Sequence, residues 1–423
     1  MSQQTTGRTH SPWAKALVAV GLLALCIPMV FHGLVGALSG AWDHERLPME
    51  RALSPETQEF LRGCYEGLDP DRLVDIHAHL AGIGAGGTGC EVNERMRTWA
   101  SPFEHVQFEA YMSAAGVDDI ERADQQFVEV LSGFARHPLP RARMGLMAFD
   151  RAYHSDGTVD LEGTTFYVPN EYVWEVCEEN SDVFFPVISI HPLRPDAVEE
   201  LERWAARGVR HMKWLPAAQR MRPDDPAVLP FLDALAAKDF TLIVHVGREE
   251  AVDADDYQSW GNPLRMRPAL DRGVKVVMAH FASMGEDEDL DDPAGPLVPS
   301  YELCMRMLTE ERYEDLLFAD VSAILFVTRY GEPLEVLLSR PELHDRLVNG
   351  SDYPLPASNI VVRLSPMVRD GFLTKAEADH LRAIYAWNPL VFDFALKRTV
   401  HHPKTGARFA PEVFESRAVI GPG

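Results

Sequence analysis

The stretch Leu73-Val-Asp-Ile-His-Ala-His79 decides how this sequence is interpreted. Side chains on a β-strand alternate between two faces, so an apolar run that contains His77 and His79 delivers both imidazoles to one side. Two neutral imidazoles on one face can hold a metal ion, although a His-x-His pair also occurs without one. The remainder of the chain therefore has to supply further ligands.

Seven further apolar runs follow, and amphipathic segments separate them. The runs are 144–149, 183–190, 209–215, 242–246, 274–279, 316–321 and 346–348, with helices expected between them, for example at 196–207, 226–238 and 301–312. This alternation is typical of βα units and a parallel sheet. The eight units predict an α/β fold, a closed (β/α)8 TIM barrel over residues 72–395.

The N-terminal region contains an uncharged segment, residues 16–38, without Asp, Glu, Lys or Arg. A helix of about 23 residues can cross a hydrocarbon layer of roughly 30 Å. We therefore predict a transmembrane anchor at 14–38, a helical linker at 39–71 and a C-terminal tail at 396–423, with a buried helix or a cleaved signal peptide as alternatives to the anchor. The free amino terminus tips the charge balance, which predicts a single-pass membrane protein with an extracytoplasmic barrel.

The overall charge limits the class of partner. The chain has 40 Lys+Arg and 64 Asp+Glu, a formal net charge of -24, which repels nucleic acid and leaves a small molecule as the expected substrate. The acidic run 286–292 is interpreted as a solvated loop rather than a second cation site. The four cysteines after the predicted anchor lack C-x-x-C spacing and are expected to be isolated thiols. Nothing in the sequence indicates the oligomeric state.

Polar side chains stand at or just beyond the ends of several predicted strands. The catalytic groups of a TIM barrel lie at the C-terminal ends of its strands, so we expect these side chains to meet at the mouth. Imidazole and carboxylate ligands suit zinc, and they also suit other divalent ions. The candidate site residues are His77, His79, Lys213, His245, His280 and Asp352.

Five motifs, in this order, resemble those of the amidohydrolase superfamily: Val-Asp-Ile-His-Ala-His, Gly-Val-Arg-His-Met-Lys-Trp-Leu-Pro, Leu-Ile-Val-His-Val-Gly, Val-Val-Met-Ala-His-Phe and Asn-Gly-Ser-Asp-Tyr-Pro. The resemblance covers roughly residues 72–395 and is greatest to the amidohydrolase-related branch, which contains metal-dependent hydrolases and decarboxylases. It implies that His77, His79 and Asp352 bind the first metal ion, with Asp352 also handling a proton.

The resemblance also implies roles for the remaining candidates. His245 and His280 match histidines that hold a second ion in two-metal members. In one-metal members the first of these joins the first site and the second assists catalysis, so His280 is a candidate catalytic residue beside Asp352. Lys213 falls where two-metal members carry a carboxylated lysine that bridges the ions. It could instead pair with a substrate carboxylate or with Asp352.

These observations predict a metal-dependent hydrolase that uses activated water on an amide, ester, lactone or related centre. The expected cofactor is one or two divalent ions, with zinc as the first choice. The alternatives are a metal-dependent decarboxylase of an aromatic or unsaturated acid, and a non-catalytic barrel that acts as a binding module. Arg248 is a candidate anchor for an anionic substrate, with a surface ion pair as the equal alternative. The sequence does not identify the substrate, because specificity lies in the loops.

Overall fold

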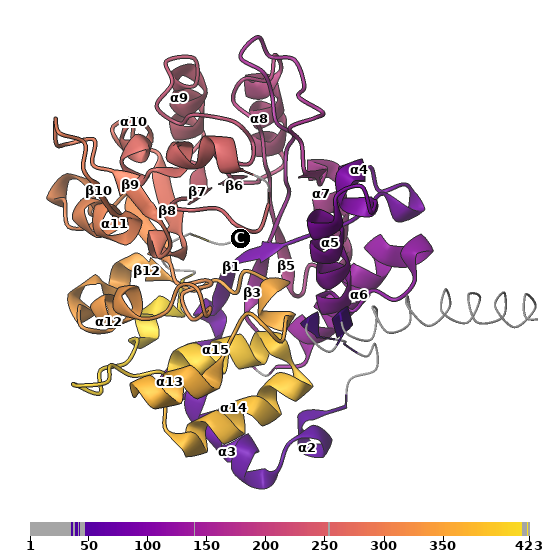
Figure 1. Ribbon diagram of the computed structural model, residues 1–423, viewed down its shortest axis with the longest axis vertical. Coiled ribbons are helices and arrows are strands. Elements are labelled where there is room, and N and C mark those ends of the chain that lie inside the picture. Colours follow the sequence, from indigo (N-terminus) through magenta and orange to yellow (C-terminus); the bar gives the residue numbers. More distant parts are fainter. Residues whose placement is uncertain are drawn as a thin grey trace, which may run out of the picture.

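The computed structural model describes residues 47–138, 140–252 and 254–416, together with 35–36, 39–40, 42 and 421 (Figure 1). Its strands are β1 (Val74–His79), β2 (Glu91–Val92), β3 (Arg143–Met147), β4 (Phe166–Tyr167), β5 (Phe184–Val187), β6 (His211–Trp214), β7 (Thr241–His245), β8 (Lys275–Ala279), β9 (Glu286–Glu288), β10 (Leu297–Pro299), β11 (Leu317–Asp320) and β12 (Leu347–Val348). Its helices are α2 (Met49–Ala52), α3 (Pro55–Tyr65), α4 (Glu94–Arg97), α5 (Pro102–Ala114), α6 (Ala123–Arg136), α7 (Asn170–Glu179), α8 (Ala197–Ala206), α9 (Leu229–Ala237), α10 (Arg267–Leu270), α11 (Ser300–Leu308), α12 (Glu332–Leu338), α13 (Leu364–Asp370), α14 (Lys375–Trp387) and α15 (Pro389–Thr399).

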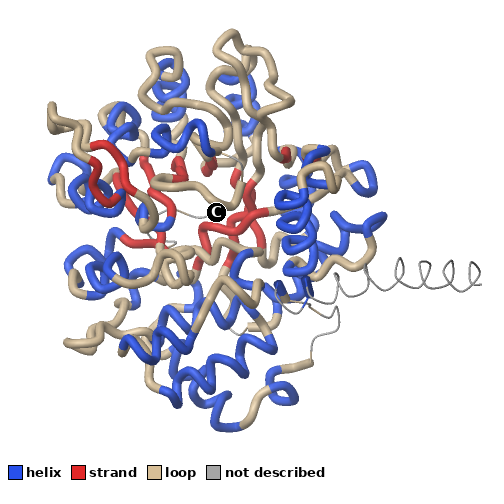
Figure 2. The backbone as a smooth tube through the Cα atoms, in the orientation of Figure 1, coloured by secondary structure: helices blue, strands red, loops and turns tan. Residues whose placement is uncertain are grey.

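The parallel strands close into a barrel. They pair in the orders β1-β3-β5 and β6-β7-β8-β11-β12, and a parallel bridge between Ile188 and Met212 joins the two sheets. Beyond β12, Asp352 N–H donates to His77 O at 2.7 Å, which returns the chain to β1. Figure 2 shows these strands at the centre with helices around them. All eight predicted strands are present, so the predicted α/β TIM barrel is confirmed.

Alternating side chains explain why this sequence forms a barrel. One face of the strands fills the interior with a small apolar cluster that includes Ile76, Phe185, Ile243 and Val277. The other face packs on the surrounding helices in a larger cluster that includes Trp204 and Trp214. The strands are therefore apolar on both faces, as in other parallel sheets whose two faces are covered.

The N-terminal part is described only in pieces. The anchor predicted at 14–38 lies outside the described residues except for Val35 and Gly36. Among the helices that the structure describes, none is both long and apolar enough for a membrane span. In the following segment Ser54 caps α3, because its Oγ accepts a hydrogen bond from Thr57 N–H at 3.3 Å and Pro55 occupies the first helical position.

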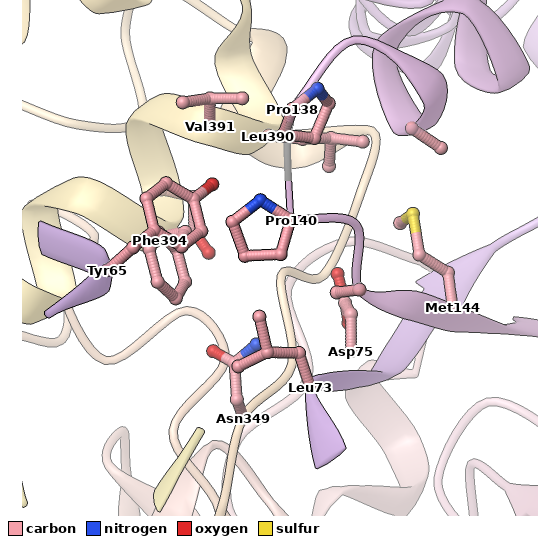
Figure 3. Close-up of a pocket in the computed structure, with 13 residues that line it drawn as sticks. Tyr65, Leu73, Asp75, Pro138, Pro140, Met144, Asn349, Leu390, Val391 and Phe394 are labelled. Carbon is pink, nitrogen blue, oxygen red and sulfur yellow. The ribbon is translucent and has the colours of Figure 1, made fainter. Parts of the chain in front are cut away.

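The segment up to Ser416 lies against the N-terminal end of the barrel, which we call the base. Val74 N–H donates to Phe414 O, and Asn349 N–H donates to Ser416 Oγ at 2.9 Å. A cavity of about 50 Å³ lies there, between Leu73 and Asp75 on one side and α15 on the other (Figure 3). The base is therefore covered by α15 and by the segment that follows it.

Three other sequence features can be compared with the structure. Cys64, Cys90, Cys177 and Cys304 are buried and unpaired, as expected. In the acidic run, Asp289 pairs with Arg306, and Asp291 pairs with both Arg306 and Arg267. These acidic groups are therefore neutralised within the protein. Residues 81–89 after β1 are rich in glycine, and this loop is held by Asp124, which accepts hydrogen bonds from the N–H groups of Ile83 and Gly84.

Candidate metal centre

The two histidines of β1 meet the carboxylate that follows β12. His77 Nε2 lies 3.2 Å from His79 Nε2, and Asp352 Oδ1 lies 3.4 Å from each nitrogen. Ligand atoms about 2.1 Å from a tetrahedral ion are about 3.4 Å apart, so the three atoms have the spacing of three ligands around one ion. His77 and Asp352 are buried, whereas His79 is partly exposed. The fourth side of such a site would face the mouth of the barrel.

Asp352 is held in place by its backbone. Its φ is +62°, a left-handed conformation that aspartate tolerates better than most residues. The hydrogen bond from its N–H to His77 O fixes this conformation. Gly350 lies two residues earlier, and a Cβ there would stand 2.6 Å from His77 Cβ. A glycine is therefore required for the chain after β12 to pass so close to β1.

Asp320, at the end of β11, was not among the site residues predicted from the sequence. Its Oδ2 lies 2.8 Å from His77 Nδ1, and its Oδ1 accepts hydrogen bonds from the backbone N–H groups of His280 and Ser322. Burial raises the pKa of Asp320, but interaction with His77 outweighs this effect and leaves the carboxylate ionised. An ionised acceptor fixes the proton of His77 on Nδ1, which leaves the lone pair of Nε2 for a metal ion. The missed signal was an aspartate inside the predicted apolar run 316–321.

His280 follows β8 and faces the other side of His77. Their rings stack with centroids 4.9 Å apart, and His280 Nδ1 lies 2.7 Å from Ser322 Oγ. Ser322 Oγ–H donates to Asp320, so it accepts from His280 Nδ1–H and leaves Nε2 of His280 as a proton acceptor. His280, Phe281 and Ala282 all have positive φ values. Three consecutive left-handed residues are strained, and such strain clusters at functional sites.

A second group of residues could also hold an ion. His77, His280 and Asp320 offer ligand atoms within 4.8 Å of one another, as do His77, His79 and Asp352. Both groups contain His77. In the group with His280 and Asp320, the Asp320 carboxylate already faces Nδ1 of His77. A proton in that hydrogen bond prevents Nδ1 from binding metal. The group of His77, His79 and Asp352 is therefore chemically the better site.

Lys213, on β6, reaches the same place. Its Nζ lies 3.0 Å from His77 Nε2, and the side chain is 1% exposed. Burial lowers the pKa of Lys213 to about 8, against the opposing influence of Asp320 and Asp352. A larger fraction of the amine is therefore neutral near physiological pH than for an ordinary lysine. An ammonium this close to a metal ligand would be repelled by a bound cation.

His245, at the end of β7, belongs to neither group of possible ligands. Its Nδ1 lies 3.1 Å from Glu249 Oε2, and its Nε2 lies 3.3 Å from Arg248 O. Its ring nevertheless lies beside that of His280, with centroids 5.0 Å apart. The structure thus brings His77, His79, Lys213, His280 and Asp352 together and places His245 at the edge of the site.

Two arginines near the mouth differ in their environment. Arg248 forms an ion pair with Glu250 in which both side chains are about half exposed, which matches the alternative expectation for this residue. Arg329, in the loop between β11 and α12, is only 8% exposed, although no motif singles it out. The buried arginine near the mouth is therefore Arg329, whereas the sequence pointed to Arg248.

Several solved structures are similar to this chain. An uncharacterised TIM-barrel protein from Bordetella bronchiseptica has 16% identity and a TM-score of 0.45, over 74% of this chain and 100% of its own. The 5-carboxyvanillate decarboxylase of Sphingomonas paucimobilis has 13% identity and a TM-score of 0.44. The match covers 82% of this chain and 98% of that protein. A probable 2-pyrone-4,6-dicarboxylic acid hydrolase from Acinetobacter baumannii has 11% identity and a TM-score of 0.41. The match covers 76% of this chain and 95% of that protein. No curated protein matches the chain.

A family model shows the relationship directly. The model described as amidohydrolase matches residues 74–391, which is most of the chain and includes every candidate site residue. The barrel, the histidine pair at the end of its first strand and this match agree with one another. The chain belongs to the amidohydrolase family of metal-dependent enzymes.

Proposed function

We propose that this protein is a metal-dependent hydrolase that holds one divalent ion on His77 Nε2, His79 Nε2 and Asp352 Oδ1. The observation that carries the proposal is the spacing of these three atoms, 3.2 to 3.4 Å, with His77 oriented by Asp320. Zinc is the proposed ion, because two imidazoles and a carboxylate suit it well. A divalent cation supplies Lewis acidity, which makes water a competent nucleophile near neutral pH.

The surrounding side chains then have separate tasks. Asp352 has an ionised carboxylate: burial raises its pKa, but interactions with His79 and His77 lower it further. It can accept a proton from the attacking water and pass it to the leaving group. His280 presents Nε2 as a second acceptor, and Asp320 keeps His77 in one tautomer. These tasks describe hydrolysis of an amide, ester, lactone or related centre.

Lys213 is proposed to be carboxylated when metal is bound. Only a neutral amine reacts with carbon dioxide, and burial lowers the pKa of Lys213 to about 8. Carboxylation would replace a cation by an anion next to the metal ligands and so remove a repulsion. Intact-mass measurement of freshly purified protein tests this idea. The expected mass increase is that of one carbon dioxide, and it is absent in Lys213→Met.

A decarboxylase is the second candidate, and one observation favours it. Among the described residues, the two groups of possible metal ligands share His77 and neither includes His245, so they do not form two separate sites for two ions. Related one-metal enzymes of the resembled branch include decarboxylases. Such an enzyme would use the same residues and would require an acid as substrate.

Metal analysis tests the centre, and product analysis tests the reaction. We expect about one ion per chain in the wild type and almost none in His77→Ala. Asp287 is the control, because its buried carboxylate accepts a hydrogen bond from Ser300 Oγ and is not a candidate ligand. The Asp287→Asn variant should therefore keep its metal. Equal metal content in the wild type and His77→Ala would refute the proposed centre.

The reaction is assigned with paired panels of esters, lactones, amides and unsaturated or aromatic acids. Metal-dependent incorporation of ¹⁸O from labelled water into a product supports hydrolysis. Release of carbon dioxide without such incorporation would replace hydrolysis by decarboxylation. Turnover that is equal in the wild type and His77→Ala would contradict both.

A further inference from the structure

Arg329 is a buried cation whose side chain makes no hydrogen bond or ion pair with the residues that the structure describes. It is 8% exposed, and its Nη1 atom is buried without a partner. A guanidinium has five N–H donors and stays charged at every physiological pH. Burying such a group without an acceptor is costly, and buried arginines in proteins are normally paired. The missing acceptor therefore needs an explanation.

The position of Arg329 indicates where that acceptor lies. The residue belongs to the loop between β11 and α12, nine residues after Asp320, at the end of the barrel that carries the metal centre. Val327 N–H donates to Val361 O at 2.9 Å, which ties this loop to the loop after β12. Phe326, Ile324 and Leu325 are buried on the same loop. Arg329 is therefore held by a packed segment rather than by a free surface loop.

Electrostatic interactions show which groups surround it. Burial lowers the pKa of Arg329, and the carboxylates of Asp352, Glu249, Glu250 and Asp320 act in the opposite direction. Burial is the main cause that lowers the pKa of His245 and that of His280. The charge of Arg329 lowers both pKa values further. Arg329 thus acts on both sides of the candidate centre, although none of these groups hydrogen-bonds to it.

We propose that Arg329 binds a carboxylate group of the substrate, so that the enzyme acts on a small organic acid. A guanidinium fork matches a planar carboxylate with two parallel hydrogen bonds, which would satisfy donors that the protein leaves unpaired. The proposal rests on the proposed function only in placing substrate at the same mouth. It holds for hydrolysis and for decarboxylation alike, because it concerns recognition and not the bond that breaks.

Arg248 provides the matched control. It lies at the same end of the barrel, but its guanidinium is already paired with Glu250 and is about half exposed. Removing it should alter little, because exposed ion pairs contribute little. Arg329→Met removes the buried charge and keeps most of the volume, and Arg329→Lys keeps the charge but loses the fork.

Binding of paired probes to the full-length, zinc-loaded protein tests the proposal by calorimetry. The probes are benzoate, phthalate and succinate, each compared with its carboxamide. In the wild type we expect at least one acid to bind about tenfold or more tightly than its amide. Arg329→Met should lose this preference, Arg329→Lys should keep part of it, and Arg248→Met should match the wild type within about twofold. A wild type without any preference, or an Arg329→Met variant that retains it, overturns the proposal.

Thermal unfolding without ligand separates binding from a structural role. Replacing a buried, unpaired charge by an apolar side chain of similar volume is often neutral or stabilising. Arg329→Met should therefore melt at the same temperature as the wild type or higher. A lower melting temperature with an unchanged preference for acids would show that Arg329 is structural. The preference is also measured in His77→Ala, so that loss of the metal centre and failure of carboxylate recognition are distinguishable.

Discussion

The two ends of the barrel both bury charged side chains, but they treat them differently. At the base, Lys397 is fully buried and donates to Gly350 O at 2.6 Å and to Asp393 Oδ2 at 2.5 Å. Asp75 accepts from the backbone N–H groups of His77 and Ser351 at 3.0 and 2.9 Å. In this base cluster of Asp75, Asp393 and Lys397, every charged group has a hydrogen-bond partner within the protein.

The mouth cluster of His77, Lys213, Asp320, Asp352 and Arg329 is incomplete by comparison. Lys213 lies near a neutral imidazole nitrogen, and the side chain of Arg329 has no hydrogen-bond partner among the described residues. Buried polar groups that are fully paired stabilise one conformation, whereas unpaired ones are costly and require a separate explanation. The comparison indicates that the base cluster serves stability and that the mouth cluster serves chemistry.

The largest difference between the two ends is expected in the unfolding free energy when each buried lysine is replaced separately. Lys397→Met leaves Asp393 without its counter-ion, and breaking a buried pair in this way costs about 3–5 kcal/mol of unfolding free energy. In the protein without metal, where Lys213 is not expected to be carboxylated, Lys213→Met removes a cation without an ionic partner, so we expect a change of less than about 1 kcal/mol. Urea denaturation of both variants measures the difference. Equal losses would abolish the distinction between the two ends.

The base should also show a dependence on pH. Burial raises the pKa of Asp393 to about 7, although Lys397 opposes this effect, whereas an unfolded aspartate titrates near about 3.9. Between pH about 4 and about 7 the folded chain therefore retains a proton that the unfolded chain has released. The contribution of Asp393 to stability should therefore fall as the pH rises through this window, by at most about 1.4 kcal/mol per pH unit.

Asp393→Asn is the matched variant for this measurement, because it lacks the titrating carboxyl group. The difference in unfolding free energy between the wild type and this variant should change between pH about 4 and about 7 and be constant above. Both proteins are unfolded in urea with a chelator present, so that metal binding does not contribute. A constant difference across the whole window would contradict the assignment.

Gly350 connects the two ends of the barrel, and its substitution should affect both. In Gly350→Ala the new Cβ would stand 2.6 Å from His77 Cβ and 3.2 Å from Ser322 Cβ, so His77 must shift. We expect a loss of about 1–3 kcal/mol in stability together with weaker metal binding. Gly63→Ala is the control, because Gly63 lies in α3 with no atom within 4 Å of the added carbon. That variant should gain about 0.5–1 kcal/mol.

The smallest of the four effects concerns Asp320 and tests the mouth alone. Asp320→Asn removes the negative charge that holds His77 Nδ1–H, and loss of such a partner weakens metal binding about 10–100-fold. Competition with a fluorescent zinc chelator measures the affinity, and Asp287→Asn serves as the control. An affinity within about twofold of the wild type would show that Asp320 does not orient the ligand.

The sequence was sufficient to predict the barrel and to place most of the candidate site residues together, for a simple reason. Strands of a parallel barrel are marked by continuous apolar runs, and their C-terminal ends meet in space. His77, His79, Lys213, His280 and Asp352 could therefore be placed together from their positions after such runs. The predicted anchor and the predicted orientation in a membrane remain predictions, because residues 14–34 lie outside the described part of the chain.

The residues that were missed depend on how loops fold, which periodicity does not describe. Asp320 closes a strand like the other candidates, but a single aspartate after a strand is common in any α/β protein. The burial of Arg329 depends on contacts between two loops, including Val327 with Val361. His245 stands where the pattern predicts, yet Glu249, four residues later, faces its Nδ1. Strand ends were thus predictable, and the partners of the side chains there were not.

The four buried thiols provide native reporters of local opening. Cys64 lies beside Thr399 near the base, and Cys90 lies in the loop that Asp124 holds after β1. Burial raises the pKa of Cys90 to about 12 and that of Cys64 as well, so neither thiol is nucleophilic while it stays covered. An alkylating reagent will therefore modify each cysteine only when its own surroundings unfold. Labelling rates at Cys64 and Cys90 would compare the opening of the two ends of the barrel without any engineered probe.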